Sequence, residues 1–370
     1  MSENKQKGSL FNILKQHALT AIAYLIPIVV GGGFLLAIGN LTGGSEIENL
    51  TDQYNFFDVM TTMGGLILGM LPVVIGTGIS FSIADKPGIA PGFLVGLISI
   101  NIDAGFIGGF IGGYIAGYLT LLLKKYIKVP QWAEGLKPML ILPLLSSLIV
   151  GFIMYYILGV PIAALISILN NFLLSLDTSQ KLTFGLIIGV LSAIDYGGPI
   201  NKVVFAFLLS FQSEGINEPM AVLMLASMVT PFGMAFAYFY QKFFNKNIYT
   251  RMEVETLKTA FPMGVCMITE GCFPIIFNDL WRSILSTGIG AGIGGALSMY
   301  WGAGSPVPHG GLFAMVTMTR PMYWFLGLII GSLVFSILFF VLKRPVDVDE
   351  VKELQIEDEK DVDLSDFKMS

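Results

Sequence analysis

The sequence predicts an all-α polytopic membrane protein with about ten transmembrane helices and at least one re-entrant hairpin. Hydrophobic residues make up 54% of the 370 positions and charged residues only 13%, about half of the roughly 25% that is usual in soluble domains. The mean hydropathy is +0.74. Apolar runs of span length recur along the whole chain, and a soluble protein has no use for so many of them.

The charge distribution divides the chain into three expected regions. These are a cytoplasmic N-terminus at 1–17, a membrane domain at 18–343 and an acidic cytoplasmic tail at 344–370. Residues 343–370 contain ten acidic and five basic side chains, which accounts for the entire net charge of −5. The acidic pI of 5.1 therefore describes the tail, and it indicates no nucleic-acid partner.

Loop charges predict the orientation. Residues 1–17 carry three lysines, whereas 41–58 carries four acidic residues and no Lys or Arg. By the positive-inside rule the N-terminus is cytoplasmic and that loop is external. Counting crossings from there places the basic segments 124–128 and 241–251 inside and the acidic segment 212–219 outside, as the rule requires.

The apolar runs give the expected spans in order. Eight of them precede residue 250, at 18–40, 59–83, 88–101, 106–123, 138–158, 161–176, 182–211 and 219–241. Two more, at 284–301 and 322–342, return the chain to the cytoplasm. This parity holds only if 257–276 does not cross the bilayer, so we expect a re-entrant hairpin there. Irregular backbone at membrane depth requires surrounding protein or a polar cavity.

Two glycine patterns stand out, and one of them predicts helix packing. Glycines at four-residue spacing between 105 and 117 form one helix face, which lets a neighbouring backbone approach closely. A formal GxGxxG at 290–295 follows no predicted strand, so we reject a nucleotide site, and the chain has no P-loop motif for an ATP-driven motor.

Cys266 and Cys272 lack CxxC spacing and are interpreted as core residues. We expect no metal and no cofactor.

The first of three polar segments within apolar sequence is 192–202, which reads SAIDYGGPINK. Asp195 and Lys202 flank a Gly-Gly-Pro sequence that breaks a helix and frees backbone groups. Asn201 adds an amide that both donates and accepts hydrogen bonds. One interpretation is a structural ion pair between Asp195 and Lys202 at a helix end, and the other is a substrate or gate site.

The second segment surrounds an isolated acid. Thr269 and Glu270 lie between Pro262 and Pro274, a pattern that predicts a broken helix with the carboxylate at its tip. Ionisable residues at this depth are functional by default. A carboxylate accepts two hydroxyl hydrogen bonds from a polyol or takes a hydroxyl proton. The alternative is a protonated, packed glutamate.

The third segment, 304–313, reads GSPVPHGGLF and holds His309, one of two histidines. It is either a ligand-binding histidine or a satisfied core one. Arg282 and Arg320 are interpreted as interfacial anchors. Discontinuous helices that meet polar groups are typical of substrate transporters. The residues alone therefore predict a small-molecule carrier whose site is either hydroxyl-binding or cation-coupled.

The same segments resemble membrane component IIC of the fructose family of the bacterial phosphotransferase system (PTS). The similar stretches occur in family order and cover nearly all of 17–340; they are HALTAIAYLIPIVVGGGFLLAI, PGIAPGFLVGLI, GFIGGFIGGYIAGYL, LKPMLILPLL, GGPINK, FPMGVCMITEG and PVPHGG. The resemblance implies a bacterial plasma-membrane permease with both termini cytoplasmic. It would bind a hexose, with fructose as the expected one, and carry it across the membrane. It would then present the sugar to a phosphocysteine on a separate IIB protein, which IIA re-phosphorylates.

The resemblance also assigns residues. Glu270, in the ITEG motif, would bind or deprotonate sugar hydroxyls as the catalytic group of this transferase subunit. The other matching substrate-binding positions are Asp195, Asn201, Lys202, Thr269 and His309. Analogy with the wider superfamily implies a homodimer and an elevator-type mechanism, in which the first half of the membrane domain is a scaffold and the second half carries the sugar site.

Three positions depart from the family pattern: Tyr196 replaces an expected Met, Cys272 an expected Ala and Phe273 a common Ile. If they line the pocket, the substrate is another hexose, a hexitol or a mannosylated compound. With neither a IIB-like nor a IIA-like segment, the chain is expected to be a stand-alone IIC. The alternative from another class is an ion-coupled secondary transporter of a sugar or polyol, in which Asp195 or Glu270 carries a proton or Na⁺.

Overall fold

The computed structural model of the protein describes residues 10–49, 51, 53–244 and 246–346. Within these residues the regular structure is helical, apart from one isolated bridge, so the predicted all-α fold is confirmed. The helices are α1 (Leu10–Leu41), α2 (Phe56–Gly69), α3 (Leu71–Ala84), α4 (Ile89–Asn101), α5 (Gly105–Tyr126), α6 (Leu142–Ile153), α7 (Gly159–Ser175), α8 (Thr178–Ala193), α9 (Pro199–Gln212), α10 (Glu218–Phe244), α11 (Arg251–Val265), α12 (Phe273–Asn278), α13 (Leu280–Tyr300) and α14 (Pro321–Leu342). Most of the expected acidic tail lies outside the described residues.

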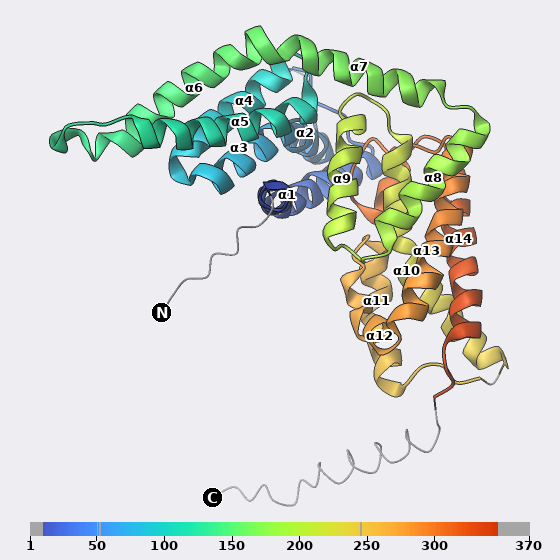
Figure 1. The fold of residues 1–370 in the computed structure, drawn as a ribbon. Coiled ribbons are helices and arrows are strands. Elements are labelled where there is room, and N and C mark those ends of the chain that lie inside the picture. The colour runs from blue at the N-terminus through green and yellow to red at the C-terminus, as the bar shows by residue number, and fades with distance from the viewer. Residues whose placement is uncertain (1–9, 50, 52, 245, 347–370) are drawn as a thin grey trace, which may run out of the picture.

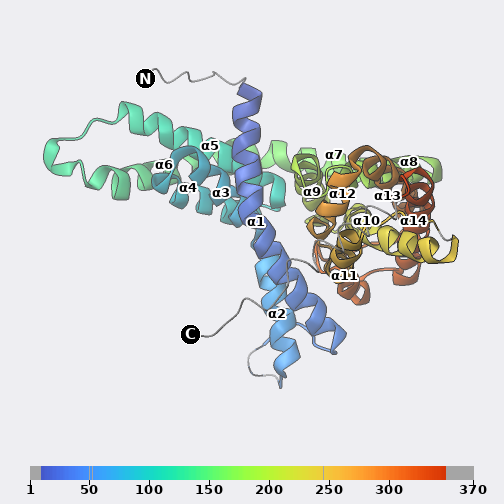
Figure 2. The ribbon, with the colours of Figure 1, turned by 90° about the horizontal axis from the view of Figure 1, so that it is seen from below.

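The helices form two bundles (Figure 1). In the first bundle, α1–α6, helix α3 packs on α1, α4 and α5, and α4 packs on α6. In the second bundle, α8–α14, helix α13 packs on α8, α10 and α14. Helix α7 continues from α6 along the edge of the molecule toward the second bundle. Figure 2 shows α1 on the side of the first bundle that faces the second, between α3–α6 and the second bundle. Helix α1 also contacts α9 of the second bundle.

Glycines make the closest helix contacts in both bundles. A Cβ on Gly109 would collide with the carbonyl of Pro72 on α3, and one on Gly113 would lie 2.8 Å from the carbonyl oxygen of Gly76. In the second bundle a Cβ on Gly290 would lie 2.6 Å from the carbonyl oxygen of Gly331 on α14. Both glycine patterns of the sequence are therefore helix-packing surfaces.

The described helices differ from the predicted spans in number. Five are long and apolar enough to cross a membrane, or six if the pair α2 and α3, bent by 44°, counts as one span. The five are α1, α5, α10, α14 and a continuous helix over Lys137–Ile168. Helices α4, α8 and α9 have 13, 16 and 14 residues, shorter than a full span. The count of about ten stays a prediction.

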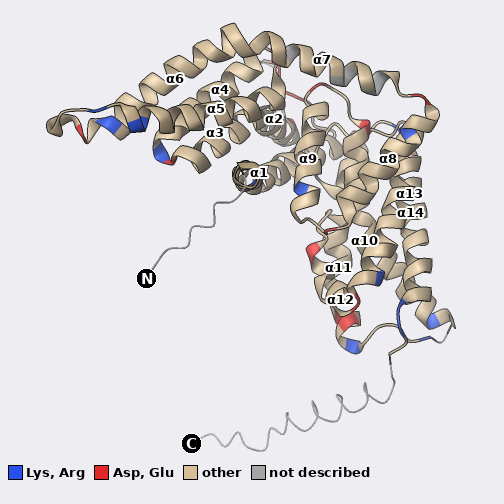
Figure 3. Cartoon of the chain, viewed as in Figure 1, with Lys and Arg blue, Asp and Glu red and all other residues tan. Residues whose placement is uncertain are grey.

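Two span boundaries are wrong. The predicted span 182–211 is two helices, α8 and α9, because Pro199 starts a new helix after Gly197 adopts a φ of 87°. The predicted gap between 138–158 and 161–176 is absent, because π-helical turns at Lys137–Ile141 and Met154–Leu158 continue the helix through it. Figure 3 shows charged residues mainly in loops and at helix ends.

Candidate functional site

The predicted hairpin at 257–276 is an interrupted helix. Helix α11 ends at Val265, Met267 adopts a left-handed φ of 66°, and a 3₁₀ turn, η5 (Glu270–Cys272), leads into α12. Helices α11 and α12 contact each other on either side of this interruption. We call residues 251–278 the glutamate hairpin, because Thr269 and Glu270 lie where its backbone is irregular. This arrangement agrees with the predicted broken helix.

A second irregular segment joins α13 to α14. Gly304 and Thr319 exchange two backbone hydrogen bonds, of 3.3 and 2.9 Å, and so close the segment 304–319, which we call the histidine loop. Within it, His309 precedes Gly310, whose φ is 124°. A Cβ on Gly311 would collide with the carbonyl oxygen of Val265. The histidine loop therefore packs directly against the interruption of the glutamate hairpin.

The third irregular segment is residues 194–198, between α8 and α9, which we call the Gly-Gly-Pro break. Asp195 caps the start of α9, since its carboxylate accepts from the backbone N–H of Ile200 at 2.5 Å and of Asn201 at 3.1 Å. The Asn201 amide donates to the carbonyl oxygen of Ser192 across the break. These contacts fix the angle at which α9 leaves α8.

The three irregular segments surround one cavity of about 180 Å³, which we call the central cavity. Its polar lining consists of Asn201, Lys202, Ser227, Thr269, Glu270 and His309, with Gly197 beside them. Five of the six predicted site residues are therefore together. Asp195 is the exception: it does not line the central cavity, and its contacts are those of a helix cap. The binding role predicted for each of the six stays a prediction.

The charged side chains in the central cavity have no partners among the residues that the structure describes. Neither the Glu270 carboxylate nor the Lys202 ammonium forms a hydrogen bond or ion pair with any described residue, so the ion pair between Asp195 and Lys202 is not formed. His309 Nδ1 accepts from the N–H of Gly310 at 2.8 Å, so a neutral ring carries its proton on Nε2. The cavity thus offers an acceptor and several donors to a ligand.

The apolar walls of the central cavity were not predicted. Ile26 and Val29 of α1 line it, although α1 belongs to the first bundle, and Phe205 and Leu223 line it from the second. A Cβ on Gly33 would lie only 2.9 Å from the His309 carbonyl oxygen. The glycines of α1 could have indicated this contact from the sequence, because a close approach of another backbone is one reason for glycine in a helix.

Comparisons with known proteins identify the family. Residues 19–281 match the family model described as phosphotransferase system, EIIC. The chain belongs to this EIIC family. It is 38% identical over 281 residues to the fructose permease IIC component of Bacillus amyloliquefaciens, an alignment that covers 76% of this chain and 91% of that protein. The resemblance found in the sequence is thereby confirmed, and the ion-coupled alternative is not supported.

Longer relatives combine EIIC with other components. The chain is 35% identical to the PTS system fructose-specific EIIABC component of Bacillus subtilis (strain 168), over 93% of this chain but 54% of that protein. It is 37% identical to the PTS system fructose-specific EIIB'BC component of Escherichia coli (strain K12), over 91% of this chain and 59% of that one. The chain thus spans little more than half the length of these curated relatives.

The fold also matches a solved EIIC structure. The match is to the transporter ChbC, the IIC component of the N,N'-diacetylchitobiose-specific phosphotransferase system, with a TM-score of 0.56 and 13% identity over 96% of both chains. At this identity the match shows the fold alone. It supports an EIIC architecture for both bundles, since the alignment covers nearly the whole chain.

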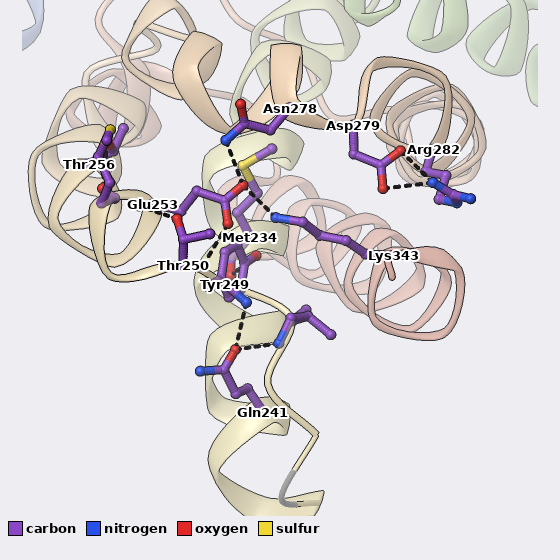
Figure 4. Close-up of polar contacts among 12 residues, drawn as sticks. Met234, Gln241, Tyr249, Thr250, Glu253, Thr256, Asn278, Asp279, Arg282 and Lys343 are labelled. Atoms are coloured by element: carbon purple, nitrogen blue, oxygen red, sulfur yellow. Dashed lines mark hydrogen bonds and ion pairs between the residues drawn. The ribbon is translucent and has the colours of Figure 1, made fainter. Parts of the chain in front are cut away.

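The base of the glutamate hairpin in this EIIC protein holds a buried polar cluster (Figure 4). Glu253 Oε1 accepts from Lys343 Nζ at 2.6 Å and from Asn278 Nδ2 at 3.2 Å, and its Oε2 accepts from the Thr250 N–H at 2.8 Å. Lys343 Nζ also lies 4.6 Å from the centre of the Tyr249 ring. The cluster joins both limbs of the hairpin to the end of α14. The sequence did not predict it.

Proposed function

We propose that this EIIC protein is the sugar-translocating component of a fructose phosphotransferase system and that the central cavity binds the hexose. The observation that supports this most is the meeting of three irregular segments around one small, mixed polar and apolar cavity. Its volume of about 180 Å³ is below the roughly 300–1,000 Å³ typical of drug-sized ligands, which favours a single sugar ring.

The polar groups suit a polyol. The Glu270 carboxylate accepts two hydroxyl hydrogen bonds, and the Lys202 ammonium offers three donors. The side-chain amide of Asn201 donates one hydrogen to the Ser192 carbonyl oxygen, and the side-chain carbonyl oxygen of Asn201 remains as an acceptor for the sugar. Phe205 supplies an apolar surface against the C–H face of the ring. Thr269 and His309 add a hydroxyl and an N–H, so donors and acceptors both face the sugar.

Glu270 is the proposed catalytic group because its carboxylate lines the central cavity and has no partner in the described part of the chain. In the proposed transfer, the sugar hydroxyl oxygen attacks the phosphorus of a phosphocysteine on IIB, and the cysteine thiolate leaves. The hydroxyl proton passes to Glu270. A positioned carboxylate base contributes about 10²–10⁴-fold to such a step. The phosphoryl donor is thus supplied by IIB and ultimately by IIA, the proposed partners.

The two bundles support the proposed movement. All polar groups of the central cavity belong to the second bundle, whereas the first bundle contributes only apolar side chains of α1. An apolar contact lets the second bundle slide past the first without breaking hydrogen bonds to the sugar. We therefore propose an elevator-type movement of the second bundle, a homodimer with the first bundle as scaffold, and a bacterial plasma-membrane location with both termini cytoplasmic.

The test uses inverted membrane vesicles that contain the protein, with purified phospho-IIB on the exposed cytoplasmic face. Radiolabelled fructose is loaded inside, with mannose and mannitol as competitors. We expect labelled fructose phosphate outside the vesicles, and none when phospho-IIB is omitted. Release of unmodified fructose at the same rate with and without phospho-IIB would contradict the proposal. Competition by mannose or mannitol that exceeds that by fructose itself would retain the mechanism and replace the sugar.

A further inference from the structure

Tyr196 is the residue of the Gly-Gly-Pro break with the least expected backbone conformation. Its φ is 50°, in the left-handed region, and its side chain is buried, with 5% of the residue exposed. Bulky residues rarely adopt this conformation, because the side chain lies too close to its own backbone. Such strain persists only where surrounding contacts determine it.

The contacts that hold Tyr196 come from two helices in the middle of the second bundle. Its hydroxyl is hydrogen-bonded to Thr287 Oγ1 of α13 at 2.9 Å, and Thr287 Oγ1 is bonded in turn to Thr230 Oγ1 of α10 at 3.1 Å. Both threonines are fully buried. The phenol is therefore fixed to the rigid part of the bundle, and the backbone next to it is fixed as well.

That backbone reaches the central cavity at Gly197. This residue lines the cavity, and a Cβ built on it would lie 3.0 Å from Glu270 Oε1, so backbone and carboxylate are neighbours. The N–H of Gly197 donates to no acceptor within the described residues. By contrast, the Tyr196 N–H donates to the carbonyl oxygen of Ala193 at the end of α8, and the Gly198 N–H donates to that of Asp195. An amide left unpaired at a cavity wall is a donor available to a ligand.

We infer that the Gly197 N–H is a further sugar-binding group and that Tyr196 is the positioning residue that holds it beside Glu270. One sugar hydroxyl then accepts from the Gly197 amide and donates to the Glu270 carboxylate, which fixes that hydroxyl in two directions. The inference rests on the proposed function of the central cavity. It assigns to Tyr196 an effect on sugar affinity that acts through the neighbouring backbone.

The test is fructose binding to purified wild-type and Tyr196→Phe protein, measured by calorimetry with fructose and a series of its monodeoxy analogues. The variant removes only the hydroxyl, so the ring still fills its site. We expect fructose affinity to fall about tenfold, because the Gly197 N–H is then no longer held in place. A loss of this size corresponds to about one hydrogen bond between that N–H and the sugar. We also expect the variant to distinguish fructose from one particular deoxy analogue less well than the wild type does.

Tyr114→Phe is the matched control. It removes a hydroxyl that donates to the Leu14 carbonyl oxygen at 2.7 Å in the first bundle, away from the central cavity. Thr287→Val is the second variant, because it removes the same anchor while Tyr196 stays intact. If Tyr196→Phe does not fold, Thr287→Val serves as the test, with the same expected loss of affinity.

The outcomes separate this inference from the function on which it rests. Weaker binding in both anchor variants, together with reduced discrimination of one deoxy analogue, supports it. A second outcome is that Tyr196→Phe and Thr287→Val bind fructose as tightly as Tyr114→Phe does, while Glu270→Gln abolishes binding. This result overturns the positioning role and leaves the proposed function in place. No fructose binding by the wild type, or binding that Glu270→Gln leaves unchanged, overturns both.

Discussion

Glu253 and Glu270 lie on the same hairpin, in the same helical bundle, and have opposite environments. Glu253, at the base, has a side chain only 3% exposed and accepts hydrogen bonds from Lys343, Asn278 and the Thr250 backbone. Glu270, at the irregular middle of the hairpin, is exposed to the central cavity and has no partner among the described residues. One carboxylate is hydrogen-bonded within the protein, and the other is exposed at the wall of the central cavity.

The comparison shows how to separate structural from functional charges in a membrane protein. A charge inside the membrane is costly, so it must find a partner or do chemistry. Glu253 has three partners, and the cluster they form holds both limbs of the hairpin against α14. That fixed base lets the irregular middle keep a strained, unpaired arrangement. The base thus supports the geometry that leaves Glu270 at the wall of the central cavity.

The largest expected effect is on Glu270. Glu270→Gln keeps the shape but removes the base and one strong acceptor, so we expect fructose phosphorylation to fall on the order of 100-fold or more. The melting temperature should change little, because no protein partner is lost. Phosphorylation is measured in vesicles with phospho-IIB, and melting in detergent. Phosphorylation at the wild-type rate would show that Glu270 is not the catalytic group.

The next largest effect is expected at the base of the hairpin. Lys343→Met leaves the Glu253 carboxylate buried without its cation, which costs about 3–5 kcal/mol of folding free energy. We expect a large fall in melting temperature and partial recovery in the double variant with Glu253→Gln, which removes the uncompensated charge.

Lys258→Met on the same hairpin is the matched control for the base. The side chains of Lys258 and Glu255 form an equally short ion pair of 2.6 Å but are 64% and 60% exposed. Loss of an exposed pair costs within about 1 kcal/mol. Equal melting temperatures for Lys258→Met and Lys343→Met would contradict the structural role of the buried pair.

The sequence was sufficient to single out the irregular middle of the glutamate hairpin, but it did not predict the polar cluster at the base. Glu270 and His309 stand out as single polar residues among Pro and Gly in apolar sequence, and a local pattern of that kind is visible without a structure. Lys343 and Glu253 are 90 residues apart and each sits at the edge of an apolar run, where a charge is ordinary. Only the packing of both α11 and α14 on α10 brings them together as a buried pair.

The meeting of the three polar segments was also beyond the sequence. Each segment is recognisable alone, but their common cavity depends on how α8, α9, α11 and α13 pack around α10. Ile26 and Val29 of α1 carry no polar signal, so their place in the cavity wall could not be predicted. The chain was correctly expected to be helical. The short helices α8 and α9 were predicted as one span, because a hydropathy pattern does not show a turn between two apolar helices.

A smaller effect is expected at Lys202, which lines the central cavity and whose ammonium has no partner among the described side chains. Lys202→Met should weaken fructose binding about tenfold, since a hydrogen bond to a charged group contributes on the order of 1.5–3 kcal/mol and part of it is replaced by water. Stability should remain unchanged. Lys202→Arg keeps the charge and is the control; affinity unchanged in Lys202→Met would remove this residue from the sugar site.

The smallest effect on binding is expected at Asp195, because its carboxylate caps α9 rather than facing the cavity. Asp195→Ala should cost about 1 kcal/mol of stability, as for other helix caps, whereas Asp195→Asn retains an acceptor and should cost less. The sequence also allowed an ion pair between Asp195 and Lys202, and a double-mutant cycle distinguishes the two arrangements. Without an ion pair, the stability changes of Asp195→Asn and Lys202→Met add to within about 0.5 kcal/mol. A larger coupling energy would mean that the two charges interact in the membrane, and Lys202 would then be held by protein rather than left free for the sugar.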